Sequence, residues 1–561
     1  MPPPPTAIPS LWRRDLLLLM AVFGLVFFFQ LGDSFLVNPD EGRYAEVPRE
    51  MLATGDWVLP RLNGVFYFEK PPLVYWCVAA LMKVFGPDEF AIRATPALFA
   101  LGGVLLTYAA ARRLHDRASG LAAATVLGTC ILYFGLGRIL ILDMAVSVLM
   151  SATLFCFILG VREAPGAKRR WLFYGLYASA ALATLAKGLI GFLVTGAVMF
   201  FWLLLFNQWR RLLPMYLPSG AALFLALAAP WHVLAAQRSD VWAKFYFIHE
   251  HWERFTTTTH GRYEPWWYFI PVLLGGLFPW TGFLWPALRD ALKGGWARRR
   301  ENADAWFLVT WAAFIFLFFS KSQSKLIPYI LPVFPALAVL IGAWLARCVR
   351  ENNSAALRPW LWIYTPFAAL LGVAMAYVVI QPGVIRNAAQ MVALRPNGIV
   401  SALALLAGAI AAPWLARRRT ALATLLAVAL PALTLELSLA HAQDEISRPG
   451  TRPLALVFKD KVQPGDRVYH YREFFHDFVF YSGHEVGTVD YVSELEVHID
   501  RAAQASGRFI DGAEFRRQWS GAGRVWAVAR KEDVTALFGD ATFRYHLIAE
   551  SRWHYLFSNQ P

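Results

Sequence analysis

The sequence predicts an all-α polytopic membrane protein with a small α/β domain at its C-terminal end. Of its 561 residues, 57% are hydrophobic, and the mean hydropathy is +0.42. Only 16% are charged, against about 25% in an ordinary soluble domain. Apolar runs of about 20 residues recur along most of the chain, which is the length of a membrane-spanning helix. These features exclude a soluble enzyme, a disordered chain and a fibrous protein, and the continuous apolar runs exclude a membrane β-barrel.

The charge of the chain is strongly basic. Lysine and arginine number 53 and aspartate and glutamate 39, which gives a net charge of +14. In a membrane protein this excess normally lies in cytoplasmic loops and beside anionic headgroups. We therefore expect membrane lipids, and no nucleic acid, among the partners.

Clusters of positive charge orient the predicted spans, because short basic loops face the cytoplasm. Arg13 and Arg14 place the N-terminus there. About thirteen spans are expected, at 15–32, 90–111, 118–137, 144–161, 172–186, 189–207, 213–235, 266–287, 305–320, 327–346, 359–381, 398–416 and 420–441. This arrangement leaves everything after residue 441 on the outer side of the membrane.

Two segments between the first two spans are predicted to lie on the outer face. PDEGRYAEVPREMLATG (39–55) is too charged to span and predicts an amphipathic helix over 41–54. PPLVYWCVAALMKVFG (71–86) is apolar but short, so it could span or lie flat. If it spanned, Arg112, Arg113 and Arg117 would lie on the outer side, so we predict a flat juxtamembrane helix.

The C-terminal part, residues 442–561, predicts a separate outer α/β domain beside the transmembrane domain 1–441. RVYHY (467–471), FHDFVFY (475–481), RVWAVA (524–529) and YHLIAE (545–550) are typical of strands. LEVHIDRAAQAS (495–506) and KEDVTALFG (531–539) are typical of helices.

Ionisable residues gather at the outer interface rather than at the membrane midplane, which disfavours a transporter. Asp40 and Glu41 directly follow the first span. Such a pair could bind a metal, act as a general base or hold a cationic sugar, or it could merely begin a helix. Glu69 and Lys70 have the same ambiguity, since the lysine could hold a phosphate or extend to the headgroups. Asp143 lies at the outer edge of an apolar span, where a carboxylate usually has a partner or a task.

The polar loop 236–265 and the outer hairpins supply further candidates. His249 and His251 have a spacing that could bind zinc, although two histidines alone are weak evidence. Arg254 is suited to bidentate recognition of a phosphate. Other polar residues at the outer ends of spans are Arg138, Lys187, Lys325 and Tyr329, which are equally compatible with solvated charges and an interfacial aromatic. Cations at membrane level beside two separated acids suit group transfer from a lipid phosphate.

Several motifs resemble the GT-C membrane glycosyltransferases that use polyprenyl-phosphate sugars, the superfamily containing protein O-mannosyltransferases. They are PDEGRYAEVPREMLATGDW (39–57), FEKPPLVYW (68–76), the outward Asp143, EHWERF (250–255) and KLIPYILP (325–332). The resemblance covers essentially the whole chain and is greatest to the bacterial aminoarabinose transferases of lipid A.

This resemblance implies a GT-C fold and an inverting transfer of 4-amino-4-deoxy-L-arabinose from undecaprenyl phosphate to lipid A phosphates. The reaction would take place at the periplasmic face of the bacterial inner membrane and give resistance to polymyxin and other cationic peptides. It further implies acidic residues at the reacting centre, donor-phosphate or substrate ligands, and a metal position. The expected residues are Asp40, Asp143 and Glu41 for the first group, Arg43, Lys70, Arg254, Tyr329, Lys187, Arg138 and Lys325 for the second, and Glu69, His249 and His251 for the third.

No cofactor is expected to be obligatory, although a divalent metal such as zinc could bind at the third group. The expected partners are the undecaprenyl-phosphate sugar and lipid A, and the chain could act as a monomer. One alternative is a transferase of the same superfamily that moves another sugar, such as mannose, to a protein or glycan. A more distant alternative is a flippase of lipid-linked sugars.

Overall fold

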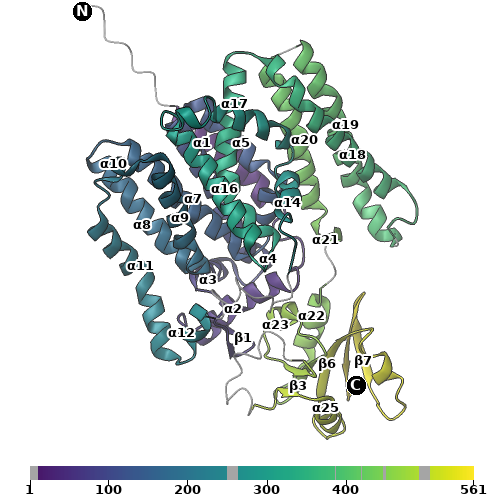
Figure 1. Cartoon of the computed structure of the whole chain (residues 1–561). Coiled ribbons are helices and arrows are strands. Elements are labelled where there is room, and N and C mark those ends of the chain that lie inside the picture. The colour runs from purple at the N-terminus through teal and green to yellow at the C-terminus, as the bar shows by residue number, and fades with distance from the viewer. Residues whose placement is uncertain (1–10, 249–262, 386, 419, 447–449, 492–505) are drawn as a thin grey trace, which may run out of the picture.

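The computed structural model describes residues 11–248, 263–385, 387–418, 420–446, 450–491 and 506–561. A large helical bundle stands beside a smaller α/β domain formed by the C-terminal residues (Figure 1). The first half of the bundle contains α1 (Trp12–Phe28), α2 (Asp40–Thr54), α3 (Leu73–Phe85), α4 (Glu89–Leu114), α5 (Arg117–Gly128), α6 (Ile131–Leu136), α7 (Leu142–Arg162), α8 (Ala167–Lys187), α9 (Ile190–Phe206), α10 (Trp209–Leu212), α11 (Leu217–Arg238) and α12 (Trp242–Lys244). The second half contains α14 (Phe269–Gly276), α15 (Leu284–Ala291), α16 (Ala303–Lys321), η4 (Ile327–Val333), α17 (Phe334–Arg350), α18 (Arg358–Ile380), α19 (Ala388–Arg418), α20 (Ala421–His441) and α21 (Gln443–Ile446).

Eight helices of the described residues are long and apolar enough to cross a membrane, or nine if one bent pair forms a single span. They are α4, α7, α11, α16, η4 with α17, α18, α19 and α20. Two further segments predicted as spans, α1 and α9, are helices of 17 residues. The chain is therefore a multi-pass membrane protein, and the count of about thirteen spans stays a prediction.

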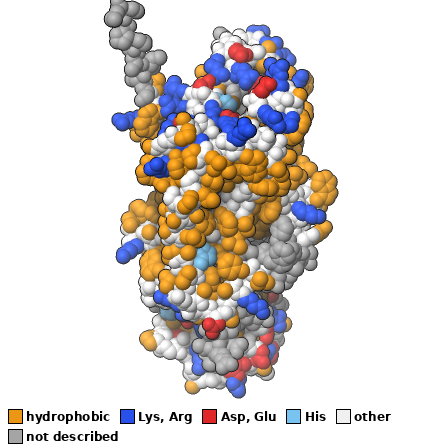
Figure 2. Space-filling model, turned by 60° about the vertical axis from the view of Figure 1, so that its left-hand side comes forward, with side chains coloured by type: hydrophobic (Ala, Val, Ile, Leu, Met, Phe, Trp, Pro, Cys, Tyr) orange, Lys and Arg blue, Asp and Glu red, His pale blue; other side chains and the backbone are white. Residues whose placement is uncertain are grey.

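The surface agrees with a membrane position. On the face in view, Figure 2 shows a broad belt of hydrophobic side chains, with many lysine and arginine side chains and a few acidic ones above it and charges of both signs below it. Large apolar side chains are exposed on two of the helices: Leu370 of α18 and Leu403 of α19 are each more than 60% exposed. Such a belt is stable when lipid tails rather than water cover it.

Two predicted spans are interrupted in the structure. The segment predicted at 118–137 is divided into α5 and α6, because Thr129 and Cys130 leave the helical conformation. The segment predicted at 266–287 is α14 followed by a helical turn and α15, with a bend of 107° between the two parts. Pro279 lies at this bend, and a proline cannot donate the backbone hydrogen bond that would continue α14. Neither segment is one continuous helix, and the assignment of each as a single span stays a prediction.

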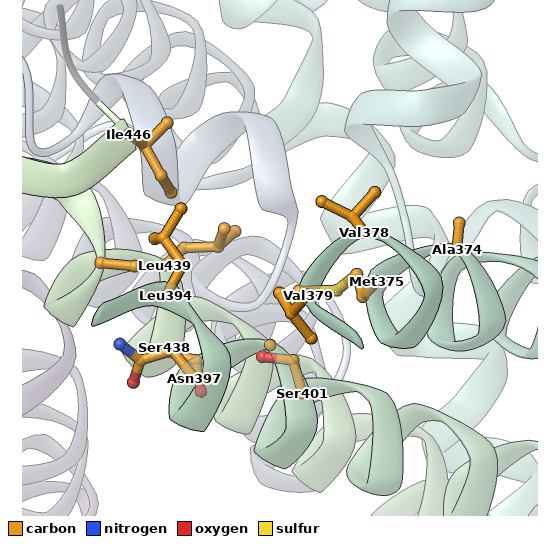
Figure 3. Close-up of a pocket in the computed structure, with 12 residues that line it drawn as sticks. Ala374, Met375, Val378, Val379, Leu394, Asn397, Ser401, Ser438, Leu439 and Ile446 are labelled. Carbon is orange, nitrogen blue, oxygen red and sulfur yellow. The ribbon is translucent and has the colours of Figure 1, made fainter. Parts of the chain in front are cut away.

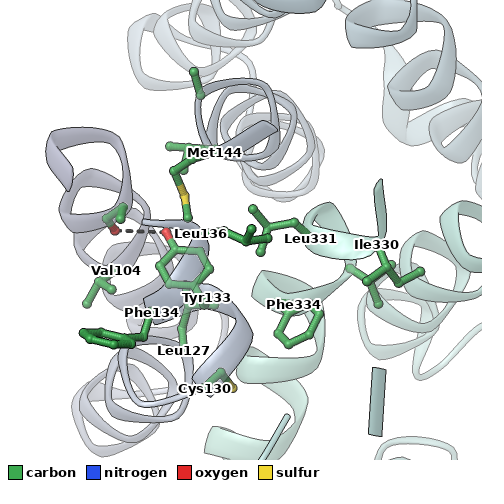
Figure 4. Packing of buried hydrophobic residues seen from close by; sticks show 14 of the residues in the cluster. Val104, Leu127, Cys130, Tyr133, Phe134, Leu136, Met144, Ile330, Leu331 and Phe334 are labelled. Atoms are coloured by element: carbon green, nitrogen blue, oxygen red, sulfur yellow. Dashed lines mark hydrogen bonds between the residues drawn. The ribbon is translucent and has the colours of Figure 1, made fainter. Parts of the chain in front are cut away.

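The core of the bundle packs around α6 and α7. The Tyr133 hydroxyl donates a hydrogen bond of 2.9 Å to the Ala100 carbonyl of α4 (Figure 4). A Cβ on Gly103 would lie 2.1 Å from this hydroxyl, so glycine allows the close approach of the two helices. Met144, Leu331 and Phe334 from neighbouring elements contribute to the same buried cluster.

The C-terminal domain is a six-stranded mixed sheet in the order β5-β4-β3-β6-β8-β7. Strands β3 to β6 pair in parallel, and β8 pairs antiparallel to both β6 and β7. The strands are β3 (Arg467–Tyr471), β4 (Gly487–Val489), β5 (Phe509–Ile510), β6 (Val525–Arg530), β7 (His546–Glu550) and β8 (His554–Ser558), and the helices are α22 (Arg452–Lys461), α23 (His476–Ser482), α25 (Gly512–Trp519) and α26 (Thr535–Phe538). Three of the four predicted strands are confirmed as β3, β6 and β7.

The predicted strand FHDFVFY (475–481) was wrong, because this segment forms helix α23. Nearly all of its side chains are buried, so the segment shows no polar face that would reveal a helical period in the sequence. Gly483 ends the helix in the left-handed conformation, with a φ of +70°. The predicted helix at 495–506 lies almost wholly outside the described residues.

Helix α23 anchors the C-terminal domain to the bundle through α2. A Cβ on Gly42 would lie 2.7 Å from the backbone nitrogen of Asp477, so the two helices touch at backbone distance. The hairpin formed by β1 (Arg61–Leu62) and β2 (Val65–Phe66) makes a second attachment. There the Asn63 side chain exchanges two hydrogen bonds, of 2.9 and 2.8 Å, with the backbone of Val486. Helix α2 is therefore held between the bundle and the C-terminal domain.

Candidate active site

Two adjacent carboxylates at the start of α2 have opposite environments. The Asp40 side chain is 53% exposed, and its Oδ1 accepts a hydrogen bond of 2.5 Å from the Arg43 guanidinium one turn later. Glu41 is fully buried. An exposed, arginine-paired carboxylate can meet a substrate, whereas a fully buried one cannot without movement of the chain.

Glu41 serves as a buried connection among three parts of the chain. Its two oxygens accept hydrogen bonds of 2.9 and 2.7 Å from Arg93 of α4. They also accept 2.9 Å bonds from the backbone nitrogens of Val37 and Leu140. Because Leu140 lies just before α7, this carboxylate links the start of α2 to the segment that leads to Asp143. These contacts favour a positioning role for Glu41 over direct participation in the reaction.

Sequence reasoning missed Arg93, which is fully buried and also donates to the carbonyl oxygens of Ser34 and Phe35. The sequence could have indicated this residue, because an arginine inside a 26-residue apolar helix requires a partner of opposite charge. Removing either member of a buried ion pair leaves the other charge uncompensated.

Tyr44 shows that three predicted acidic residues converge. Burial raises the pKa of its hydroxyl, and the charges of Asp40, Glu69 and Asp143 raise the pKa further, while that of Arg43 lowers it. These groups come from α2, the segment after β2, and α7, so they are far apart in sequence yet act on one side chain. Tyr44 was also missed, and its position one turn after Asp40 was the available signal.

Lys70 and Glu69 follow the β1–β2 hairpin. Lys70 is only 8% exposed, and its ammonium donates a 3.0 Å hydrogen bond to the Glu69 carbonyl. Burial raises the pKa of the neighbouring Tyr67 hydroxyl, with Glu69 raising it further and Arg43 lowering it. Arg43 therefore acts on Tyr67 as well as on Tyr44, which places the FEK segment beside the start of α2.

Asp143, Lys187 and Tyr329 form a second group, brought together by three elements. Asp143 lies in the first turn of α7, and its carboxylate forms an ion pair with Lys187 at the end of α8. The Lys187 ammonium lies 4.8 Å from the centre of the Tyr329 ring, within cation–π range. Gly188 ends α8 with a φ of +97°, which lets the chain turn immediately after the lysine. The three residues singled out from separate spans therefore meet.

Two other predicted cations make backbone contacts instead. Lys325 is 4% exposed and donates to the carbonyls of Ser322 and Glu264, at 2.6 and 2.7 Å. Burial lowers the pKa of its ammonium. Arg138 is 2% exposed and donates to the Phe27 carbonyl, at 2.9 Å, near the end of α1. These contacts tie loops and helix ends together and favour anchoring roles for both residues.

The candidate metal position is only partly described, because His249, His251 and the candidate phosphate ligand Arg254 lie outside the described residues. Within the described part of the chain, no group of three or more histidine, cysteine or acidic side chains is arranged to hold a metal ion. Of the three residues expected to bind a metal, the structure describes Glu69 alone. A carboxylate oxygen can contribute to a zinc site but does not define one.

The arrangement combines acids with cations at the end of the bundle that meets the C-terminal domain. Asp40 with Arg43 and Asp143 with Lys187 both act near Tyr44, with Lys70 on the adjoining segment. Fixed cations stabilise the charge that develops on a departing phosphate, and nearby carboxylates orient or deprotonate an acceptor. The geometry fits transfer of a group from a phosphate-linked donor.

Comparisons with known proteins agree with this geometry. The family model of dolichyl-phosphate-mannose-protein mannosyltransferases matches residues 69–233. The undecaprenyl phosphate-α-4-amino-4-deoxy-L-arabinose arabinosyl transferase of Pectobacterium carotovorum is 33% identical over 361 residues, or 64% of each chain. The protein of the same name from Erwinia tasmaniensis is 33% identical over 383 residues, or 67% of each chain. The first of these alignments thus spans just under two thirds of the relative's length.

Solved structures extend the likeness to the whole chain. ArnT from Cupriavidus metallidurans in the apo state superposes with a TM-score of 0.84 and 29% identity, covering 98% of both chains. The same protein bound to undecaprenyl phosphate superposes with a TM-score of 0.83 and 30% identity, covering 97% of this chain and 98% of ArnT. An oligosaccharyltransferase, AglB from Archaeoglobus fulgidus, shares only the fold, with a TM-score of 0.52 at 12% identity.

Proposed function

This chain belongs to the family of the undecaprenyl phosphate-aminoarabinose arabinosyl transferases, and from that premise we propose that it glycosylates lipid A. The proposed donor is 4-amino-4-deoxy-L-arabinose on undecaprenyl phosphate, and the proposed acceptors are lipid A phosphate groups. The observation that carries this proposal is the pair of carboxylate–cation contacts, Asp40 with Arg43 and Asp143 with Lys187, whose acids both act on Tyr44. The ArnT complex with undecaprenyl phosphate supports the proposed donor.

The reaction has a simple balance. An acceptor phosphate oxygen attacks the anomeric carbon of the sugar, and the bond from that carbon to the undecaprenyl phosphate oxygen breaks with its electron pair. Undecaprenyl phosphate departs as the anion, and the anomeric configuration is inverted. Because the attacking oxygen is already anionic near neutral pH, the step needs no general base.

We assign the cations to the donor phosphate. Arg43 and Lys70 lie on the two segments that meet beside Tyr44 and Tyr67, so both can face a phosphate at the membrane surface. Arg254, from the outer loop, is the proposed third cation, and the Tyr329 hydroxyl would add a hydrogen bond. Each fixed positive charge lowers the barrier to departure of the phosphate anion, by about 3 kcal/mol for a well-placed contact.

We assign Asp40 and Asp143 to the sugar. Asp40 is exposed and held by Arg43, while Asp143 is held by Lys187. In these positions the carboxylates would attract the protonated 4-amino group and align the anomeric carbon with the attacking oxygen. A donor with a neutral sugar would lose this attraction, which offers a physical basis for selection of an aminosugar.

We also propose a site for a divalent metal, with Glu69 and either His249 or His251 as its ligands. The transfer proposed above does not require the metal at any step. If a divalent ion such as zinc serves the reaction, treatment of purified protein with a chelator should lower the rate, and zinc should restore it.

The proposed setting is the bacterial inner membrane, with the site and the C-terminal domain in the periplasm and a monomer as the working unit. Cationic sugars on lipid A phosphates reduce the negative charge that cationic peptides such as polymyxin recognise. The transferase would therefore confer resistance to these peptides.

Mass spectrometry of lipid A tests the proposal. Cells that make undecaprenyl-phosphate aminoarabinose but lack their own transferase would carry an empty vector, this protein or its Asp40→Ala variant. We expect one added aminopentose per phosphate with the intact protein alone. Well-expressed protein without this increment would contradict the proposed acceptor, and a glycosylated protein in the same cells would indicate the mannosyltransferase-like alternative instead.

A further inference from the structure

A cavity of about 250 Å³ lies among α18, α19 and α20, near the ends of these helices that approach the C-terminal domain (Figures 1 and 3). Its walls are mainly aliphatic and include Met375, Val379, Leu394 and Leu439. This volume is below the range of about 300–1,000 Å³ found for drug-sized ligands. It fits part of one hydrocarbon chain.

The lining of the cavity also includes polar side chains, which come from α19 and α20. Ser401 is fully buried, and its hydroxyl has no hydrogen-bond partner among the described residues. Asn397 lies one turn earlier on α19, and Ser438 contributes from α20 (Figure 3). A buried hydroxyl without a partner has lost its hydrogen bonds to water and destabilises the protein. An acceptor oxygen on a ligand would remove this cost.

The position of the cavity indicates a lipid. Only 22% of α18 and 39% of α19, in their most apolar windows, are buried within the protein, so hydrocarbon surrounds much of both helices. Ser438 lies three residues before the end of α20 at His441, a distance of about 5 Å along the helix axis. With the end of α20 placed at the membrane surface, this depth corresponds to the boundary between headgroups and hydrocarbon, where the ester carbonyls of glycerophospholipids lie.

A positively charged side chain, Arg395, lies at the edge of the cavity. Arg395 is exposed on α19, and its Nε donates a 3.3 Å hydrogen bond to the carbonyl of Val379, a residue of the cavity wall. The guanidinium therefore lies beside the cavity at the outer end of α18, where it can pair with a lipid phosphate. A positive rim favours an anionic headgroup over a zwitterionic one.

We propose that this cavity binds one anionic glycerophospholipid of the outer leaflet. One acyl chain fills the aliphatic space, its ester carbonyl accepts a hydrogen bond from Ser401 or Asn397, and the phosphate lies beside Arg395. The lipid would join the α18–α19 hairpin to α20 at a place where protein side chains leave a gap. This inference is independent of the transferase activity, because it concerns binding at a different place in the fold.

Native mass spectrometry of delipidated protein in detergent, titrated with phosphatidylglycerol or phosphatidylcholine, tests the proposal. We expect one tightly bound phosphatidylglycerol per chain and weaker binding of phosphatidylcholine. Ser401→Leu fills the cavity and should abolish this event, while Arg395→Gln should weaken it about tenfold, which corresponds to about 1.4 kcal/mol. The matched control is Val400→Leu, because Val400 is 50% exposed on the same helix.

A second variant separates loss of the site from loss of the fold. Ala374→Phe introduces a ring at the exposed edge of the cavity on α18, where it disturbs little packing. If Ser401→Leu elutes as aggregate, Ala374→Phe must show the loss of phosphatidylglycerol. Unchanged phosphatidylglycerol binding in the folded cavity-filling variants, or equal affinity for both lipids in the unaltered protein, would overturn the proposal.

Discussion

Helices α7 and α18 are both long and apolar, yet the protein uses them differently. In their most apolar windows, 83% of α7 is buried within the protein, against 22% of α18. Asp143 at the start of α7 is joined to α8 by an ion pair, and the preceding segment is joined to α2 through Glu41. Helix α18 packs mainly on α19 and exposes large side chains such as Leu370. The candidate site thus lies in the part of the bundle whose helices are joined by ion pairs and hydrogen bonds. These contacts hold the side chains of the site in fixed positions.

The largest expected effect is a loss of catalysis when a carboxylate of the candidate site is replaced. Asp40→Asn and Asp143→Asn keep the size of the side chains but remove the charges that hold the aminosugar. We expect each to lower kcat/KM for the undecaprenyl-phosphate donor by at least about 100-fold in protein that stays folded, as a single cooperative unfolding transition would show. Glu351→Gln, an exposed acid far along the chain, is the matched control. Activity within twofold of the control in either variant would remove that residue from the reacting centre.

The next effect concerns the buried connection beneath the site. Glu41→Ala leaves the Arg93 guanidinium without its carboxylate, which should destabilise the protein by about 3–5 kcal/mol and lower its apparent Tm in detergent. The double variant Glu41→Ala with Arg93→Met removes both charges and should recover part of this loss. If the double variant were no more stable than Glu41→Ala, the pair would not be the cause of the destabilisation.

A smaller, pH-dependent effect is expected where α2 meets the hairpin. Burial, together with the neighbouring Glu46, raises the pKa of Glu50 to about 8. The folded protein therefore holds a proton that the unfolded chain releases above its ordinary pKa of 4.5, so the stabilisation is lost as the pH rises toward 8. We expect a higher apparent Tm at pH 6 than at pH 9. Glu50→Gln should reduce this difference in apparent Tm. If the variant showed the same pH dependence as the unaltered protein, the role assigned to Glu50 would be wrong.

The smallest effect is expected on the lipid-facing hairpin. Leu370 of α18 is 68% exposed, so Leu370→Ala removes contacts with lipid tails and little protein packing. We expect a change within about 0.5 kcal/mol in stability and full transferase activity. Leu154→Ala on α7, where the side chain is fully buried, should instead cost about 2–5 kcal/mol. Equal losses of apparent Tm in the two variants would remove the distinction drawn between the helices.

Much of the fold could be predicted because hydropathy and helix length are local properties of the sequence. The helices α4, α7, α16 and α18 lie where the apolar runs placed them. The errors arose where local patterns are ambiguous. Helix α23 is buried on nearly every side, so its segment resembles a strand, and the bend between α14 and α15 depends on how the chain packs around Pro279.

The candidate site divides in the same way. The sequence by itself determined the residue types at the ends of the apolar spans, because an ionisable group beside such a span needs a partner or a function. Only the tertiary structure decided which carboxylate faces outward: Asp40 is exposed and paired with Arg43, whereas its neighbour Glu41 is buried against Arg93. It also brought Asp143, Lys187 and Tyr329 together from three elements. The physical reason is that the environment of a charge depends on the packing of segments distant in the chain, which no local pattern records.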